Sequence, residues 1–422
     1  MSSISDQLKN TKSVLRWLVC LAYAGLFFSI KVSNVTIGLL LLFCLIKTPP
    51  LDYLKTLKNS FSSKIVIAIF LLCVIGLLYT TNIPAGLFTL ERKATLLLIP
   101  FFLLPILQKY NLPDSILFKR IGYITMASIL ILLVTASFKK FILGNDQAFY
   151  FEYFTYPHYV YYSIYFVFGS LVLIDSFFEE WMQSKKGVLF IIGLFSFSLC
   201  MLILIASKAG MITFCVSVVV LLYKRVRRKR IVAIAIVSFF LLGSIFLALN
   251  KTTQERFMGL GQDLTTVFEE TLPDKLVLTN VNLRLLFWKI AVTHSWEDGL
   301  VIAGVGTGDV QDYLNTLYSL PKYQLYSFVN WDSHNQWVFT YIQLGLIGIS
   351  IMAILYVVSL RAALRMNDIK FLIFLIVTLG YSMSESILES NKGIIFFALL
   401  FTVLSAPYQL PAASLAGEKN QV

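Results

Sequence analysis

The feature of this sequence that most constrains its fold is the repeated occurrence of long apolar blocks. Stretches such as Ile231 to Leu249 and Phe371 to Thr378 are almost entirely apolar, and a helix of about 20 such residues can cross the hydrocarbon core of a bilayer. A helix satisfies its own backbone hydrogen bonds inside lipid, whereas the strands of a membrane barrel would alternate in polarity. The blocks therefore predict an all-α polytopic membrane protein.

Composition excludes water as the main solvent of this chain. Of its 422 residues, 58% are hydrophobic and only 14% are charged, which is far from the averages of soluble domains. The formal net charge of +12 would suggest a nucleic-acid partner in a soluble protein, but most lysines and arginines lie in short links between apolar blocks. We therefore expect membrane lipid as a partner and no nucleic acid.

The apolar blocks predict about twelve transmembrane helices. The basic run from Lys224 to Arg230 is the strongest mark of orientation, because short basic links between spans remain in the cytoplasm. Counting from this run places the other basic links on the same side and both termini in the cytoplasm. The spans are expected at residues 16–30, 33–47, 64–80, 94–108, 119–138, 158–175, 188–206, 209–223, 231–249, 336–360, 370–386 and 393–407.

One long polar loop lies on the side opposite the basic links. The predicted organisation is a bundle of nine helices over residues 1–249, a loop domain over 250–333, and three last helices with a cytoplasmic tail over 334–422. Within the loop, apolar residues repeat at helical spacing from Leu283 to Ala291. This repeat predicts an amphipathic helix that lies against the membrane or the bundle.

His334 and Asn335 open the apolar block that follows the long loop. Gly345 and Gly348 come ten and thirteen residues after Asn335, and small residues of this kind let another helix approach closely. Taken alone, this spacing favours an interfacial histidine followed by helix-packing glycines, because a single histidine is weak support for catalysis.

The order His334-Asn335, nine further residues, and then Gly345-x-x-Gly348 is similar to the signature of bacterial O-antigen ligases and of the related O-antigen polymerases. Members of these families have about twelve spans and a long periplasmic loop just before the signature histidine, and both features are expected here along essentially the whole chain. The resemblance implies an enzyme of the bacterial inner (cytoplasmic) membrane with a periplasmic active site.

The resemblance also implies a reaction, in which a sugar chain moves from undecaprenyl pyrophosphate to a hydroxyl of an acceptor glycan, which for the ligase is the lipid A core. Neutral imidazole, with an ordinary pKa of about 6.5, can take the proton of an attacking hydroxyl. We therefore expect His334 to be the catalytic base.

The departing pyrophosphate is negatively charged, and a guanidinium can bind its oxygens in a bidentate way. Arg284 resembles the loop arginine of the family and is the second expected catalytic residue. Trp288 follows it by four residues, and thus shares its helix face and the expected substrate site. The alternative for Arg284 is an interfacial arginine whose charge reaches lipid headgroups.

Lys208 is a further candidate for substrate binding. It lies between two expected spans, at the place where these ligases usually carry a second arginine. Lysine keeps the positive charge but cannot form the bidentate contact of a guanidinium. The sequence therefore departs from the family pattern here, and phosphate binding by Lys208 and an ordinary interfacial role stay equally open.

Arg92, Lys93, Glu389 and Asn335 complete the expected substrate-binding set. Arg92 and Lys93 precede a span and would bind phosphate or only anchor a helix at the interface. Glu389 lies with Glu385 between the last two spans, where a carboxylate would orient the histidine or bind sugar hydroxyls. For both carboxylates a solvated turn is the favoured interpretation.

No metal and no cofactor are expected, because the outer loops contain neither an Asp-x-Asp pair nor a cluster of histidine and aspartate. His158 lies among tyrosines typical of an interface belt, and His294 is expected to pack structurally. Gly304, Gly306 and Gly308 are expected in tight turns, because no Walker lysine follows them.

Four other functions remain open at this point. An O-antigen polymerase and a protein O-glycosylating ligase share the donor chemistry and differ only in the acceptor. A flippase of lipid-linked sugars is disfavoured, because ionisable residues are scarce in the middle of the apolar blocks. A structural scaffold predicts that His334 can be replaced without loss of activity.

Overall fold

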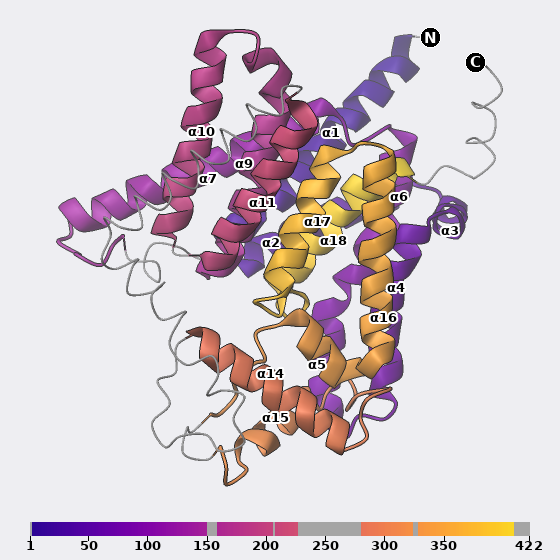
Figure 1. The fold of residues 1–422 in the computed structure, drawn as a ribbon. Coiled ribbons are helices and arrows are strands. Elements are labelled where there is room, and N and C mark those ends of the chain that lie inside the picture. The colour runs from indigo at the N-terminus through magenta and orange to yellow at the C-terminus, as the bar shows by residue number, and fades with distance from the viewer. Residues whose placement is uncertain (1, 150–157, 206, 227–279, 324–327, 409–422) are drawn as a thin grey trace.

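A computed structural model describes residues 2–149, 158–205, 207–226, 280–323 and 328–408 (Figure 1). These residues form helices and loops and contain no strand, which confirms the predicted all-α membrane class. The helices are α1 (Ser2–Phe28), α2 (Ile30–Lys47), α3 (Pro50–Asn59), α4 (Phe61–Leu77), α5 (Ile83–Lys93), α6 (Thr95–Lys109), α7 (Ser115–Phe141), α9 (Tyr159–Trp181), α10 (Lys185–Leu204), α11 (Lys208–Arg225), α14 (Asn280–Glu297), α15 (Val310–Tyr318), α16 (Gln336–Arg365), α17 (Ile369–Ser382), η3 (Ile387–Glu389), α18 (Asn391–Ser405) and η4 (Ala406–Tyr408).

Seven helical stretches of the described residues are long and apolar enough to cross a membrane. Two shorter apolar helices accompany them, Ser63–Leu77 and Ile369–Ser382. The span expected at 231–249 lies outside the described residues, and the total of about twelve stays a prediction. The seven stretches are Leu8–Phe28, Ile30–Lys47, Ser115–Phe141, Tyr159–Trp181, Lys185–Leu204, Gln336–Arg365 and Asn391–Tyr408.

Helices α9 and α18 form the centre of the bundle. Nearly every side chain from Val160 to Asp175 is buried, and so are those from Gly393 to Ser405. In contrast, α7 leaves large apolar side chains such as Leu130 and Val134 exposed. Apolar side chains on the outside of a bundle are expected where lipid is the surrounding solvent.

Ion pairs join the helices at one end of the bundle, which we call the basic end. Asp175 of α9 contacts Arg225 of α11 at 2.8 Å and also pairs with Lys370 of α17. Arg16 of α1 donates from Nε to Asp114, the N-cap of α7, at 2.9 Å. Figure 1 shows the N-terminal end of α1 and the link between α16 and α17 at the top, at this end of the bundle.

A second hydrophobic cluster lies at the opposite end, where α14 and α15 pack below the bundle in Figure 1. The predicted amphipathic stretch is α14, and its apolar face contacts α15 and the first turns of α16. A separate core of this kind holds the helices of the loop domain in a defined position. Its buried residues are Leu286, Phe287, Ile290, Ala291, Val310, Leu314, Leu317, Tyr318, Tyr323, Phe328 and Ile342.

Helix α16 is broken at Gly345, where the backbone has φ of 62° and ψ of −156°. The break frees carbonyls and N–H groups that would otherwise bond within the helix. Residues 301–306 satisfy them: Gly306 donates to the carbonyl of Gln343 at 3.0 Å, and Leu346 donates to that of Val301 at 2.8 Å. The expectation that Gly345 lets a helix approach is therefore corrected, since Gly345 opens α16 to a loop.

The loop that fills the break in α16 requires glycine for steric reasons. A Cβ on Gly304, which has φ of +69°, would lie 2.4 Å from the carbonyl oxygen of Ile342. Gly306 has φ of +102° and is pressed against Thr80. Left-handed backbone and close approach both select glycine. The expectation of tight turns at these glycines agrees with this geometry.

Candidate active site

Glu385 lies at the centre of the candidate active site, in the short link between α17 and η3. Its Oε2 contacts Nδ1 of His334 at 3.2 Å, and its Oε1 accepts from Nη2 of Arg284 at 2.6 Å. The Glu385 side chain is 12% exposed, against 30% for His334 and 28% for Arg284. One buried carboxylate thus joins the two expected catalytic side chains, which come from different parts of the chain.

The loop before α16 sets the position of His334. Asn335 is the N-cap of α16, and its side-chain oxygen accepts from the backbone N–H of Trp337 at 2.8 Å. Its amide nitrogen donates to the carbonyl of Met383 at 3.2 Å, two residues before Glu385. His334 itself has a positive φ of 48°. Asn335 therefore ties the histidine to the loop that carries its carboxylate partner.

The contact with Glu385 decides which imidazole nitrogen of His334 is basic. A carboxylate only accepts hydrogen bonds, so Nδ1 must carry the hydrogen that lies between the two groups. In neutral imidazole the lone pair then remains on Nε2. The arrangement prepares Nε2 of His334 to take a proton from a hydroxyl group.

Arg284 and Trp288 lie on the same face of α14, as their spacing predicts. Arg284 uses Nη2 for Glu385. Trp288 donates from Nε1 to the carbonyl oxygen of Ser333 at 2.8 Å, so its indole attaches α14 to the residue before His334. Trp288 thus positions the two catalytic candidates relative to each other, and contact with substrate stays a prediction.

Asp332 is a second acid beside His334 that the sequence did not single out. Burial raises the pKa of the Asp332 carboxyl, and a positive charge on His334 opposes that rise. Its position two residues before the histidine was visible in the sequence, but its burial depends on the folded loop.

Lys93 and Glu389 form a buried ion pair next to this group. Lys93 Nζ lies 2.6 Å from Glu389 Oε1, and it also donates to the side-chain oxygen of Gln343 at 2.9 Å. The two side chains are 4% and 9% exposed. Burial raises the pKa of Glu389, and the ammonium of Lys93 opposes that rise. In this structure the two expected substrate-binding residues bind each other.

Arg92 joins the same network from the end of α5. It donates from Nη1 to the backbone carbonyl of Glu389 at 2.9 Å and from Nη2 to Thr89 at 3.2 Å, and its guanidinium lies over the ring of Phe88. Nε of Arg92 and Oε2 of Glu389 are buried without a hydrogen-bond partner among the described residues. Buried polar atoms are normally paired, so these two atoms retain capacity for a ligand.

Lys208 begins α11 at the same end of the bundle. The preceding residue, Ser207, accepts from Ser163 at 2.8 Å and lies 3.4 Å from the hydroxyl of Tyr381. The carbonyl of Tyr381 in turn accepts from the backbone N–H of Glu385 at 2.9 Å. The structure therefore places Lys208 near the link that carries Glu385, and its binding role stays a prediction.

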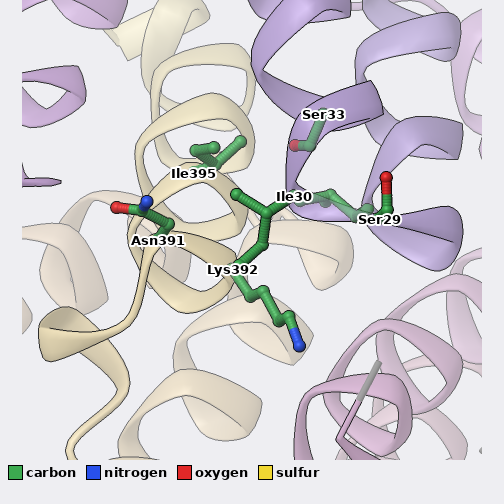
Figure 2. A pocket seen from close by; sticks show the side chains of 7 residues that line it. Ser29, Ile30, Ser33, Asn391, Lys392 and Ile395 are labelled. Atoms are coloured by element: carbon green, nitrogen blue, oxygen red, sulfur yellow. The ribbon is translucent and has the colours of Figure 1, made fainter. Parts of the chain in front are cut away.

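The other two histidines and Lys392 make contacts of their own. His294 pairs with Glu297 of its own helix at 2.9 Å, and His158 caps α9 with its ring against Tyr159. Lys392 lines a separate small hollow between α18 and the junction of α1 with α2 (Figure 2). In that view its ammonium points away from the neighbouring Asn391.

The geometry combines a base, a cation and a shared carboxylate in one place. Such a group can remove a proton from a hydroxyl at one side and stabilise developing negative charge at the other. Among the described residues no three histidine, cysteine, aspartate or glutamate side chains gather as a metal site would require. The expectation of metal independence stays a prediction.

The comparison with protein families gives one match. A family model described as O-antigen ligase matches residues 193–353, well under half of the chain. The match confirms the resemblance drawn from the sequence, and it includes Lys208, Arg284 and His334. It ends before Glu385, so the contact of this carboxylate with His334 and Arg284 comes from the structure and not from the family match. A search of curated proteins finds no match.

Proposed function

We propose that this chain, which resembles the O-antigen ligase family over residues 193–353, transfers a glycan from undecaprenyl pyrophosphate to a hydroxyl of the lipid A core. The reaction would take place at the periplasmic face of the bacterial inner membrane. The observation that carries this proposal is the contact of one buried carboxylate, Glu385, with both His334 and Arg284.

His334 acts as the base in this proposal. As the acceptor oxygen attacks the anomeric carbon of the donor sugar, Nε2 takes the proton of the attacking hydroxyl. The new glycosidic bond forms while the bond from the anomeric carbon to the pyrophosphate oxygen breaks. Glu385 stabilises the imidazolium that results and keeps the ring oriented. A single displacement of this kind inverts the configuration at the anomeric carbon.

Arg284 stabilises the leaving group. Within the part of the chain that the structure describes, Glu385 contacts Nη2 of Arg284, and the other guanidinium nitrogens would bind the oxygens of the pyrophosphate. We assign supporting contacts with the phosphates to Arg92, Lys93 and Lys208, and contact with a sugar hydroxyl to Glu389. Nε of Arg92 and Oε2 of Glu389, which have no hydrogen-bond partner within the described ranges, support the assignments for these two residues.

The acceptor distinguishes this proposal from its nearest alternatives. An O-antigen polymerase or a protein-glycosylating ligase would use the same base and cation. Deleting the gene and separating the envelope glycolipid on a gel tells them apart. A ligase deletion leaves bare core, whereas a polymerase deletion leaves core with a single repeat unit.

A direct assay tests the transfer chemistry. Purified protein, lipid-linked glycan and core acceptor should yield product without any ion gradient, which a flippase would not do. His334→Ala should lower kcat by about 10²-fold or more, the usual contribution of a general base. Glu385→Gln should also lower kcat, and adding it to His334→Ala should change little, because the two residues act as a unit.

Glu91→Gln is the matched control, since Glu91 is an exposed carboxylate at the same end of the bundle. It should retain the wild-type rate. Full transfer by His334→Ala, in the assay and in cells, would show that the imidazole is not the base.

A further inference from the structure

Trp331 is the exposed aromatic side chain that lies next to the proposed base. Its ring centroid is 6.4 Å from that of His334 and 5.9 Å from that of Phe287. Phe287 is fully buried in the core of the loop domain, whereas Trp331 is 42% exposed. Part of the indole is therefore supported by the core and part faces outward, beside the imidazole.

The backbone on the N-terminal side of Trp331 is held in place. Asn330 has a positive φ of 57°. Its backbone N–H donates to the side-chain oxygen of Asn315 at 2.9 Å, and its own side-chain oxygen accepts from the Asn315 amide at 2.9 Å. A left-handed residue persists only where such contacts stabilise it.

The backbone on the C-terminal side is held as well. Gln311 donates to the carbonyl of Trp331 at 3.4 Å, and Trp288 donates to that of Ser333 at 2.8 Å. His334 follows with its own positive φ. The contacts on both sides of Trp331 thus set its outward position next to the proposed base.

We infer that the indole of Trp331 is the surface on which a sugar ring of the acceptor glycan stacks. The C–H face of a pyranose is apolar and packs against an aromatic ring, while its hydroxyls need polar partners at the edge. Asn330 and Asp332 flank Trp331 in the chain, and the amide of Gln311 lies at its backbone carbonyl.

Because Trp331 lies beside His334, we expect its indole to bind a sugar of the acceptor and not of the donor. His334 takes the acceptor's proton in the proposed reaction, whereas Arg284 lies across Glu385 and binds the donor's pyrophosphate. A sugar stacked on Trp331 would present its hydroxyl to the imidazole. The inference rests on the proposed function and adds a residue that determines acceptor affinity.

The test compares variants in purified full-length protein in nanodiscs. The donor is the lipid-linked glycan, and the acceptor is the envelope glycolipid extracted from a strain that lacks the gene. Trp331→Phe keeps a flat ring, and Trp331→Leu keeps apolar character without one. We expect Trp331→Leu to raise the acceptor KM about tenfold, close to the effect of losing one stacked ring. Trp331→Phe should stay within about threefold, and kcat and the donor KM should change little.

Trp296→Leu is the matched control, because Trp296 is an exposed tryptophan of α14 that contacts neither His334 nor Phe287 in the described structure. It should retain the wild-type acceptor KM. If the acceptor KM of Trp331→Leu equals that of Trp331→Phe, the ring serves only as an apolar contact, such as one with the membrane surface, and the inference fails. A rise in the donor KM instead of the acceptor KM would also overturn it.

A second measurement does not depend on the Leu variant. Core oligosaccharide released from the same glycolipid should protect one tryptophan of the wild type from acrylamide quenching. This protection should disappear in Trp331→Phe, and its persistence there would refute the assignment. If the wild type transfers no glycan, the proposed function fails, whereas wild-type transfer with an unchanged acceptor KM in Trp331→Leu removes the inference alone.

Discussion

At the scale of single residues, the buried charges of Lys93 and Glu389 stabilise each other. Both are buried, at the junction of α5, α16 and η3. Taking two charges out of water is costly, and their mutual attraction and added hydrogen bonds offset that cost. Gln343 and Gln336 supply such bonds, to Lys93 and to Glu389 respectively.

Lys93→Met should therefore destabilise the protein by about 3 kcal/mol or more at pH 8, because it leaves a buried carboxylate without its partner. Burial raises the pKa of Glu389 in the folded state. The folded variant then binds more protons than the unfolded chain, so its stability should recover as pH falls through that raised pKa. Thermal unfolding in detergent at several pH values measures this.

The double variant Lys93→Met/Glu389→Gln should unfold at a higher temperature than Lys93→Met alone, since no unpaired charge remains. Lys55→Met, at an exposed lysine of α3, is the control and should leave unfolding unchanged. If Lys93→Met is as stable as the wild type, the buried pair with Glu389 does not stabilise the fold, whatever the effect on the donor KM.

The sequence predicted His334 and Arg284 through a family resemblance, and the structure brings both to one carboxylate. It did not predict Glu385, for which a solvated turn was favoured. The expected span 370–386 ended too late: α17 ends at Ser382, so the link folds over His334. The signal available was a pair of acids, Glu385 and Glu389, in a link between two apolar spans.

At the scale of helices, the break in α16 could not be predicted from its own residues. From the sequence, Gly345 is interpreted as a glycine that packs against another helix within an apolar span. Its actual conformation depends on residues 301–306, forty residues earlier, which satisfy the backbone groups that the break releases. Non-helical backbone within a membrane helix persists only where protein supplies such partners.

Gly345→Ala should destabilise the protein by about 2 kcal/mol or more. At positive φ with extended ψ, a region that essentially only glycine adopts, an alanine costs about 1–3 kcal/mol. Its Cβ would also lie 2.3 Å from the carbonyl of Ile302, which must move. Because Asn335 caps the first turn of α16 and helps to position His334, the rate of glycan transfer should fall as well. The unfolding temperature and the transfer rate measure the two effects.

Gly38→Ala is the control for this change. Gly38 lies within α2 with nothing within 4 Å of its Cβ position, and alanine favours a helix over glycine by about 1 kcal/mol. Its stability should be equal to or higher than that of the wild type. An equal loss of stability in Gly345→Ala and Gly38→Ala would mean that the backbone conformation at the break in α16 has no specific effect on stability.

At the scale of the whole molecule, the charged residues at one end of the bundle join helices, whereas those at the other end form the candidate active site. Counting spans predicted that the links alternate between the two sides of the membrane, and this alternation stays a prediction. Asp175, Arg225 and Lys370 meet at the basic end, whereas Glu385, His334 and Arg284 meet at the other. A lipid-linked donor presented in the periplasm requires the second group to face outward.

Cysteine labelling tests this orientation. In a background without the five native cysteines, Glu91→Cys reports on the active-site end and Lys55→Cys on the basic end, since both positions are exposed. A membrane-impermeant maleimide should label Glu91→Cys in cells whose outer membrane alone is permeabilised. Lys55→Cys should react only after the inner membrane is broken, because basic links stay in the cytoplasm. The reverse pattern would place His334 and Arg284 in the cytoplasm, away from the proposed acceptor, and would contradict a periplasmic transfer.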